Sequence, residues 1–466
     1  MSGSNGGTEA KVRVRFEPMT GTPEDLRVSD APFVLPQKLG RYGLSEVINH
    51  LLQQQQGPQQ QAQPFDFSVQ GVLLRTQLKT FIASNKVSLE EVLVIEYMPA
   101  LSLSEETQTI EAPAWIGCLS TDVVDNTVVT GCYDGTIQLA SSASLLGTGA
   151  APKDLGLVSI QAHDDPIRAI ACWQRVGGGA FFLATASKDL SLKCWSVQPL
   201  CAPSSSAKAA PGAQQLASLT GHINSVESVV HWAQQNVLLS GDWAGNIFGW
   251  NVEKLGQQQQ QGDGGEQHTS KKKKTAERGD AVASVVDIKS AFTVRAHSQS
   301  VSGIAVGPGA RVFSCSWDHS LKEWDMERQD CVSTFVSGSK VMTSLSFSER
   351  SNAVVTSHPD GRVRLWDMRS QSSDGENHCR SVYSVSTGGQ WVAQACWHPT
   401  LDNVFASCDY AGIVRVWDVR ATSPLGSSEA HDGKALSVAW LQGQGQGQTK
   451  VVSGGSDCLL RATAFG

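Results

Sequence analysis

The sequence of 466 residues has few of the features that mark a membrane, secreted or nucleic-acid-coating protein. No stretch approaches the roughly 18 consecutive apolar residues that indicate a transmembrane helix, so we expect no membrane association. Residues 1–25 contain no apolar h-region, and we therefore expect no secretory signal. The formal net charge of −7 argues against a wholly basic protein that coats nucleic acid.

The 11 cysteines show neither a disulfide framework nor a zinc-binding pattern. Their number is odd, they are scattered from Cys118 to Cys458, and no Cys-x-x-Cys pair supplies ligands at short spacing. We interpret them as reduced, mostly buried thiols of a cytosolic or nuclear protein. With 40% hydrophobic and 17% charged residues the chain can bury a sizeable core, which excludes disorder throughout.

Tyrosine is scarce, with 5 residues, whereas there are 13 tryptophans, and several of these recur in one context. Five segments contain small residues, a turn with Asp or Gly and alternating apolar positions, and they end in Trp195, Trp250, Trp324, Trp366 and Trp417. The period-two alternation predicts a strand, a tight turn and a second strand in each segment.

A small residue followed by histidine precedes strands of this pattern at Ala162-His163, Gly221-His222, Ala296-His297 and Ala430-His431. With Trp-Asp at three segment ends, this arrangement resembles the WD-repeat family, whose repeats of about 40–45 residues fold as four-stranded propeller blades. Two degenerate segments carry Ala140 and Thr463 at the tryptophan position. The sequence therefore predicts an all-β, seven-bladed WD40 propeller.

The resemblance implies a buried network in each blade that joins the histidine, a turn aspartate, a strand Ser or Thr and the tryptophan. Blade two offers His163, Asp189 and Trp195 with Ser187 or Thr185, and blade four offers His297, Asp318 and Trp324 with Ser316 or Ser314. The other predicted members are His222, Trp250, Asp360, Trp366, Trp417 and His431. In blades three and six, Ala244 and Ala411 replace the turn aspartate, with Asp242 and Asp409 two residues earlier, which puts these two networks in doubt.

No catalytic machinery is visible outside these repeats, and we expect that the chain is not an enzyme. A His-Asp-Ser constellation that recurs from blade to blade indicates a scaffold, because an active site would not be repeated. The sequence shows no separate nucleophile–base pair, no phosphate-binding glycine loop and no metal-ligand cluster.

The last blade lacks its outer strand, because the sequence reaches Gly466 just after the third strand of that blade. An unpaired sheet edge favours aggregation. We therefore expect the residues around Glu105–Glu111 to supply the missing strand and to close the ring. The propeller is predicted to span residues 100–466.

A low-complexity insertion at 256–280 separates the third and fourth blades. It contains four consecutive lysines, namely Lys271, Lys272, Lys273 and Lys274. Such a run can serve as a nuclear-import signal or contact RNA phosphates, and it can equally be a solvated loop. These alternatives remain open at this stage.

Residues 10–99 contain no WD pattern and are predicted to form a separate α+β domain of the ubiquitin-like (β-grasp) class. Lys11–Phe16 alternates as a strand, Leu44–Leu52 places apolar residues at helical spacing, and Val92–Tyr97 is a further strand.

The run Arg41-Tyr-Gly-Leu-Ser-Glu-Val-Ile-Asn-His-Leu-Leu52, with Phe33-Val-Leu-Pro before it and Pro64-Phe-Asp-Phe67 after it, resembles a Notchless-like domain. With seven blades and a long basic insertion before blade four, the chain resembles the ribosome-biogenesis WD-repeat protein twelve family. That family provides the propeller subunit of the Pescadillo (PeBoW) complex.

The resemblance implies that the N-terminal domain binds the metal-ion-dependent adhesion site of midasin, an AAA ATPase. Glu90, or Glu91 if the register is shifted by one, would complete the coordination of a divalent cation, Mg²⁺, that the partner holds. No cofactor of the chain's own is implied. Midasin would then remove the chain from the pre-ribosome.

The resemblance further implies that the propeller binds the block-of-proliferation WD-repeat protein and thereby Pescadillo, on the precursor of the large (60S) ribosomal subunit. This predicts a role in rRNA maturation and a location in the nucleus, in nucleolus and nucleoplasm, and it leaves direct RNA contact open. The alternative is a substrate receptor of a cullin-RING ubiquitin ligase, because Trp366-Asp-Met-Arg369 and Trp417-Asp-Val-Arg420 resemble WDxR boxes.

Overall fold

The computed structural model describes most of the chain, and the fold and contacts given below are those of the described residues. These are residues 10–19, 22–56, 63–88, 92–100, 103–121, 127–146, 157–174, 181–197, 213–256, 285–336, 338, 340–369, 381–421, 423–443 and 449–465. They divide into two units, one mainly within residues 1–102 and the other mainly within residues 103–465. Among the described residues no helix has the length and apolar character needed to cross a membrane.

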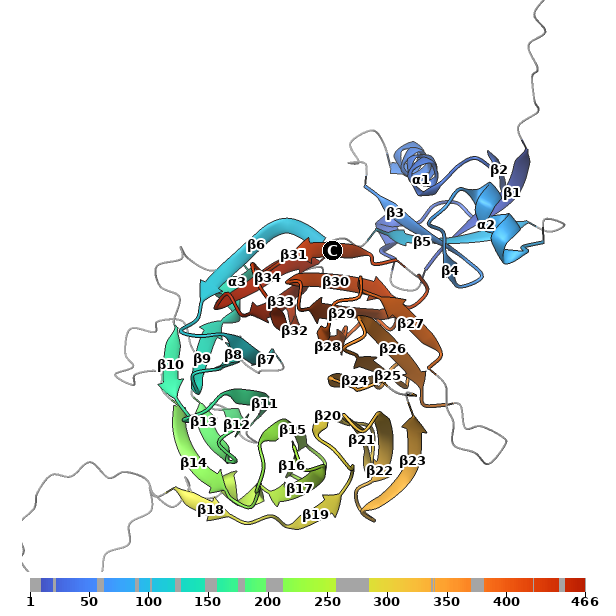
Figure 1. Ribbon diagram of the computed structural model, residues 1–466. Coiled ribbons are helices and arrows are strands. Elements are labelled where there is room, and N and C mark those ends of the chain that lie inside the picture. The colour runs from blue at the N-terminus through green and yellow to red at the C-terminus, as the bar shows by residue number, and fades with distance from the viewer. Residues whose placement is uncertain are drawn as a thin grey trace, which may run out of the picture. The chain divides into compact units, whose positions relative to one another are not determined.

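A five-stranded sheet of the order β2-β1-β5-β3-β4 forms the N-terminal unit (Figure 1). The central strands β1 and β5 are parallel, and every other pair is antiparallel, which is the arrangement of a β-grasp domain. The strands are β1 (Lys11–Pro18), β2 (Phe33–Pro36), β3 (Phe65–Val69), β4 (Val72–Leu73) and β5 (Leu93–Pro99). The α+β class predicted for this region is confirmed.

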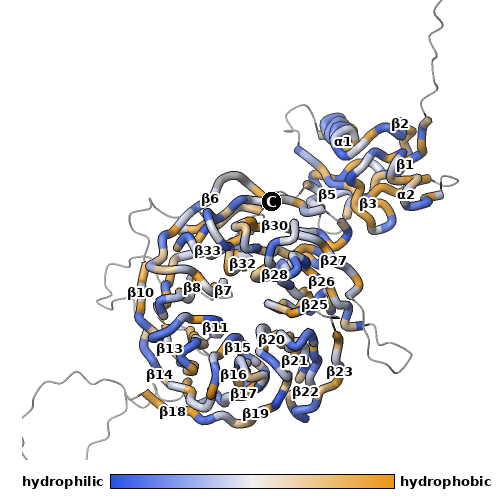
Figure 2. Tube along the Cα trace, in the orientation of Figure 1, coloured by the Kyte–Doolittle hydropathy of each residue, from blue (hydrophilic) through white to orange (hydrophobic). Residues whose placement is uncertain are grey.

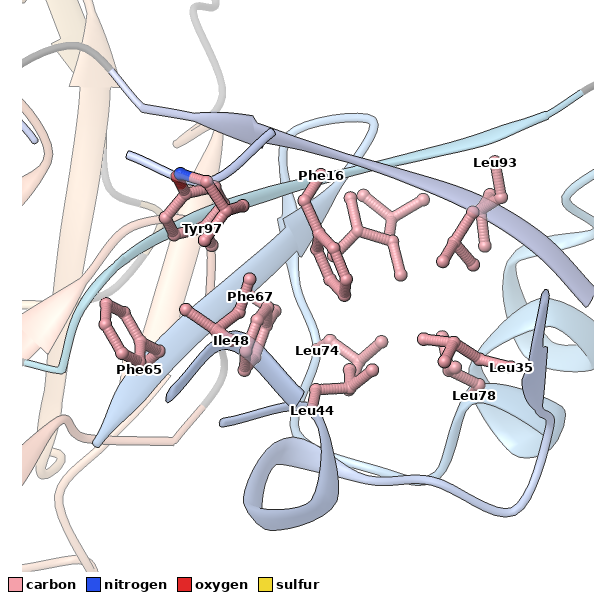
Figure 3. Packing of buried hydrophobic residues seen from close by; sticks show 14 of the residues in the cluster. Phe16, Leu35, Leu44, Ile48, Phe65, Phe67, Leu74, Leu78, Leu93 and Tyr97 are labelled. Atoms are coloured by element: carbon pink, nitrogen blue, oxygen red, sulfur yellow. The ribbon is translucent and has the colours of Figure 1, made fainter. Parts of the chain in front are cut away.

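Two α-helices pack against this sheet in a common core, α1 (Arg41–Gln56) and α2 (Leu78–Asn85), and a short 3-10 helix, η1, covers Glu24–Leu26. Leu44, Ile48 and Leu52 follow helical spacing on one face of α1 and are at most 1% exposed. Figure 3 shows Ile48 near Phe65 and Phe67, and Leu44 near Leu74, in the same cluster.

The buried Tyr97 of β5 shows how this core accommodates a polar group. Its hydroxyl donates a hydrogen bond to the carbonyl of Leu26 (3.1 Å) and accepts one from the amide of Val28 (2.8 Å). The ring packs edge-on against Phe16 and Phe65. The phenol therefore gains apolar burial while both hydrogen-bonding functions of its hydroxyl are satisfied.

Seven further sheets in the residues that the structure describes form a ring of blades (Figure 1), and the predicted WD40-type propeller fold is confirmed. Blades one and two are β7 (Ile116–Ser120), β8 (Thr127–Cys132), β9 (Thr136–Ser141) and β10 (Val158–Gln161), then β11 (Ile167–Gln174), β12 (Phe181–Ser187), β13 (Leu192–Val197) and β14 (Ala213–Leu219). Blades three and four are β15 (Val226–Trp232), β16 (Val237–Asp242), β17 (Asn246–Asn251) and β19 (Phe292–Arg295), then β20 (Val301–Val306), β21 (Arg311–Ser316), β22 (Ser320–Asp325) and β23 (Asp330–Val336).

Blades five, six and seven repeat the same antiparallel order. They are β24 (Ser344–Ser348), β25 (Ala353–Ser357), β26 (Arg362–Asp367) and β27 (Tyr383–Ser386), then β28 (Val392–Trp397), β29 (Val404–Asp409), β30 (Ile413–Asp418) and β31 (Gly426–Glu429), then β32 (Ala435–Gln442), β33 (Thr449–Gly455) and β34 (Leu459–Phe465). Two short helices, α3 (Ser142–Leu146) and η2 (Glu253–Gly256), follow β9 and β17. Figure 2 shows both hydrophobic and hydrophilic residues along the strands of the ring.

The outer strand of blade seven comes from the segment before blade one. β6 (Leu103–Glu111) pairs antiparallel with β34, with Ile110 opposite Leu460 and Glu111 opposite Leu459. Ile110 is buried in the cluster that joins blades seven and one. The predicted closure of the ring by residues around Glu105–Glu111 is confirmed.

Hydroxyl side chains join neighbouring blades near the centre of the ring. Ser228 donates to the carbonyl of Val301 (3.1 Å), Ser302 to that of Met342 (2.7 Å), and Thr343 to that of Val392 (2.8 Å). Thr121 makes the corresponding bond from blade one to Trp440 of blade seven (2.7 Å). These bonds pair buried carbonyl groups that the strand ladders of a single blade do not reach.

The chain after the low-complexity insertion makes a contact that the sequence did not predict. β18 (Val286–Ile288) pairs in parallel with the outer strand β14 and adds a fifth strand to blade two. On the other side of the insertion, Leu255 is buried in the same cluster of blades two and three that Val286 and Ile288 pack against. Both ends of the insertion are thus anchored at these two blades.

Substitution of Ile110 tests the closing strand, because Ile110 is buried whereas its neighbour Thr109 is exposed. We expect Ile110→Ala to lower the free energy of unfolding of the propeller by about 2–5 kcal/mol through the cavity it leaves. Thr109→Ala should change it by no more than about 0.5 kcal/mol. Urea unfolding followed by tryptophan fluorescence reports on the propeller alone, because Trp115 is the first tryptophan of the chain. Equal effects of the two substitutions would contradict a closing role of β6.

Candidate functional site

Two sets of predicted site residues lie outside the described residues. Glu90 and Glu91 fall between Ser88 and Val92, and Lys271–Lys274 fall between Gly256 and Val285. The structure thus leaves the metal-ligand and nuclear-import predictions untested. Before Glu90, Lys86 caps the C-terminus of α2, with a left-handed φ of 51° and an amide that donates to the carbonyl of Ile82.

The predicted members of the network in blade two lie together. The indole N–H of Trp195 donates to the Thr185 hydroxyl (3.1 Å), and that hydroxyl lies 2.7 Å from Nε2 of His163. Nδ1 of His163 lies 2.8 Å from the Asp189 carboxylate. Because an indole N–H can only donate, Thr185 accepts from Trp195 and donates to His163, which in turn donates to Asp189. Of the two candidates left open, Thr185 is the member and Ser187 instead bonds to the carbonyls of Asp165 and Pro166.

Blade four repeats this network with a serine. Trp324 donates to the Ser314 hydroxyl (2.8 Å), which lies 2.8 Å from Nε2 of His297, and Nδ1 of His297 lies 3.1 Å from Asp318. Burial lowers the pKa of His297 despite the nearby Asp318, which is consistent with a neutral imidazole that accepts at Nε2. Burial alone would raise the pKa of Asp318, but hydrogen bonds with His297 and Ser320 hold it well below its usual value.

Blade three has a full network in spite of Ala244. Trp250 donates to Ser240 (2.8 Å), Ser240 lies 2.7 Å from Nε2 of His222, and Nδ1 of His222 lies 3.4 Å from Asp242. Asp242 thus reaches the histidine from two residues earlier than the usual turn position. The network that Ala244 put in doubt is therefore present in this blade. The backbone amide of Asn246 also donates to the Asp242 carboxylate.

In the described residues no histidine joins the network of blade six, since His398 stands between β28 and β29 and packs against Trp440 of blade seven. Trp417 donates to Ser407 (2.8 Å), while Asp409 forms an ion pair with Arg415. Thr387 occupies the backbone position that histidine has elsewhere, since its amide bonds to Gly361 as that of His431 bonds to Gly412. An arginine thus takes over the charge compensation of the turn aspartate.

Blade five draws its histidine from an unexpected place. His358 stands in the turn after β25, and its Nε2 lies 2.9 Å from the Thr356 hydroxyl, to which Trp366 donates (2.9 Å). Nδ1 of His358 lies 2.7 Å from the Val341 carbonyl, so no carboxylate is required, and Asp360 pairs with Arg364 instead. Sequence reasoning missed His358, because it looked for the histidine before the blade.

Blade seven has the histidine, the aspartate and the hydroxyl of the network but not the tryptophan. His431 lies 2.9 Å from Asp457 through Nδ1 and 2.9 Å from the Ser453 hydroxyl through Nε2. Thr463 stands at the tryptophan position and is buried. The network histidines His163, His222, His297, His358 and His431 are all buried, which makes the networks structural supports rather than sites accessible to a substrate.

The buried thiols also lack the character of nucleophiles. All nine described cysteines are free, and Cys132, Cys194, Cys315 and Cys408 are buried. Burial raises the pKa of Cys132 to about 11 and that of Cys315 to about 12. No group of three or more His, Cys, Asp or Glu side chains in the described ranges is arranged to hold a metal ion.

The arginines of the two WDxR boxes already have hydrogen-bond partners within the chain. Arg420 forms a bidentate pair with Asp418, with Nη2 at 2.6 Å and Nε at 2.9 Å from the carboxylate. Arg369 donates to the carbonyl of Ser351 (3.0 Å). These contacts favour a structural role at the ends of the blades over docking on a ligase adaptor.

The hydroxyl of Thr185 can be removed without change of shape by Thr185→Val, which leaves His163 and Trp195 without their shared partner. We expect a loss of about 1–3 kcal/mol in the free energy of unfolding for each group left unpaired. Thr185→Ser keeps the hydroxyl and should lose only about 1 kcal/mol with the methyl group. Denaturant unfolding of the two variants measures the difference, and equal losses would show that the network is not what stabilises the blade.

Stability should fall in mild acid, because burial lowers the pKa of His231, His358 and His398 to about 4. The unfolded chain binds protons on these side chains below about pH 6.5, whereas the folded chain does so only near pH 4. The stabilisation is therefore present above pH 6.5 and is lost as the pH falls toward 4.5. Urea midpoints at pH 7, 6 and 5 should fall less steeply for His358→Asn than for the exposed control His50→Asn, and identical slopes would contradict the assignment.

Comparison with known proteins identifies both units. The family model of the NLE (NUC135) domain matches residues 12–82, and that of the WD domain, G-beta repeat, matches residues 288–325 and 329–367. A ribosome biogenesis protein WDR12 homolog from Chlamydomonas reinhardtii is 30% identical over 466 residues, which cover 97% of each chain. The WDR12 homolog of Oryza sativa subsp. japonica is 29% identical, and the ribosome biogenesis protein YTM1 of Candida albicans is 26% identical, each over 98% of both chains. The chain therefore belongs to the WDR12/YTM1 family of ribosome biogenesis proteins.

Proposed function

We propose that the protein is a non-enzymatic assembly factor of the large (60S) ribosomal subunit that supports rRNA maturation. The observation that carries this proposal is the match to named ribosome biogenesis proteins over 97% of both chains, which includes both units. The closed propeller, with its structural networks and buried thiols, supports the role of a scaffold rather than a catalyst.

We further propose a division of labour between the two units. The propeller binds the block-of-proliferation WD-repeat protein, joins Pescadillo through it, and holds the chain on the pre-60S particle in the nucleolus and nucleoplasm. The N-terminal unit is the part that a midasin-type AAA ATPase grips in order to remove the chain. Lys271–Lys274 remain the candidate for a nuclear-import signal.

Glu90 is the proposed contact with midasin, with Glu91 as the alternative one residue on. A carboxylate suits an open coordination site of a hard cation such as Mg²⁺ that the partner holds. The described residues on either side belong to regular elements, because Asn85 ends α2 and Leu93 begins β5 in the centre of the sheet.

The test measures binding of the full-length chain to the isolated adhesion-site domain of midasin in the presence of Mg²⁺. We expect Glu90→Ala to weaken binding at least about tenfold, or about 1.4 kcal/mol, and EDTA to do the same for the wild type. Glu24→Ala removes an exposed carboxylate elsewhere in the unit and should have no effect. Unchanged affinity of both Glu90→Ala and Glu91→Ala would refute the proposed contact.

A further inference from the structure

Six aromatic side chains at one end of the propeller take no part in the blade networks. They form what is called the aromatic array here, namely Trp115, Tyr133, Trp243, Trp317, Trp391 and Tyr410. Trp115 and Trp391 directly precede the first strand of a blade, and the others directly follow the second strand. Backbone hydrogen bonds join these two kinds of position, from Tyr133 to Trp115 and from Tyr410 to Trp391 (2.9 Å each). The array therefore lies on one face of the ring, the loop face.

The rings of the array contact one another across blades. Trp243 and Trp317 have centroids 5.2 Å apart, Trp317 and Trp391 are 6.4 Å apart, and Trp391 stacks on Tyr410 at 5.5 Å. These contacts run from blade three through blade four to blade six. Trp115 and Tyr133 of blade one form a further pair at 5.6 Å. The array is thus made of connected rings rather than scattered surface residues.

Much of this face is apolar and open to solvent. Trp115 is 47% exposed and Trp243 is 46% exposed. Leu190, in the turn after β12, is 44% exposed, and Ile223, before β15, is 76% exposed on the same face. A cluster of exposed apolar side chains on a folded protein marks an interaction site, and tryptophan is the residue most enriched where binding energy concentrates.

The chain itself shows that these rings hold cations. The guanidinium of Arg168 lies 5.6 Å from the ring centroid of Tyr133 and donates to its hydroxyl (3.1 Å). The ammonium of Lys434 lies 4.7 Å from the centroid of Tyr410. In the described part of the chain no cation lies over the exposed rings of Trp115 and Trp243, which leaves their faces available to a cation from elsewhere.

Exposed carboxylates accompany the array. Asp164 and Asp165 precede β11, and Asp432 precedes β32, all on the loop face. Within the ranges that the structure describes, none of the three forms an ion pair. Carboxylates at this position repel the phosphates of a nucleic acid and attract arginine or lysine. Lys188 and Lys434 are also exposed on this face, so the carboxylates attract a cation only at their own positions, and the open tryptophan faces supply the second attraction for the same kind of partner.

We propose that the loop face binds a segment of a partner protein that carries arginine or lysine beside apolar side chains. The apolar side chains pack on Trp115, Trp243 and Ile223, and the cations lie on the tryptophan faces and against Asp164 and Asp165. This rests on the proposed function in one respect, since the partner is sought among the proteins of the complex that the propeller holds.

The test uses the full-length chain, purified from cells with its bound complexes, with the photo-crosslinking residue p-benzoylphenylalanine in place of Trp243. We expect a crosslink to one protein segment that contains arginine or lysine within a few residues of the linked position. The matched control places the same residue at Val332, which is 53% exposed on the outer strand β23 and should not link to that segment. Crosslinks removed by ribonuclease would assign the face to RNA and overturn the proposal, as would the absence of a protein crosslink at Trp243.

Substitutions then measure the contribution of the face. Trp243→Ala, and Asp164→Asn with Asp165→Asn, should each reduce recovery of the crosslinked partner at least about tenfold, as for residues at the centre of an interface. Val332→Ala should not, and unchanged thermal midpoints would show that the variants fold. Full recovery with both sets would overturn the proposal. If ribosome-assembly proteins copurify normally but Trp243 gives no protein crosslink, the docking proposal is refuted and the proposed function stands. If the crosslinked segment belongs to a protein unrelated to ribosome assembly, the proposed function is contradicted and the docking proposal stands.

Discussion

The pairing of β6 with β34 is the constraint on which the propeller depends. Each of the other blades takes its four ring strands in chain order, interrupted in blade three by β18, whereas blade seven is completed from the segment before blade one. Without this pairing the ring would have a free sheet edge and a cluster of apolar side chains without a partner. β6 also connects the N-terminal unit to β7.

The buried networks make each blade a rigid unit, and they do so with interchangeable chemistry. A hydroxyl that accepts from tryptophan and donates to histidine is supplied by Thr185, Ser240 or Ser314, and the histidine comes from before the blade or from its own turn. Only the satisfaction of buried donors and acceptors is common to them. The networks thus explain stability, whereas the loop face and the N-terminal unit carry the surfaces available for partners.

Local patterns predicted most of the fold, and non-local contacts account for what was missed. The tryptophan segments, the α1 helix and the closing strand follow from periodicity and from counting strands. β18 could not be predicted, because three residues that pair in parallel with a strand of another blade leave no local signal. His358 and Asp242 were misjudged for a related reason, since their roles depend on reach in space rather than on their place in the repeat. Glu90 rests on family resemblance alone and stays a prediction.

The central claim is that the propeller holds the chain in its complex while the N-terminal unit serves removal. Quantitative mass spectrometry of proteins copurified with the full chain and with a chain lacking residues 10–99 tests it most directly. The account predicts that the shortened chain, which retains β6, recovers Pescadillo at the level of the full chain and loses midasin. Loss of Pescadillo together with midasin, or recovery of midasin by the shortened chain, would contradict it.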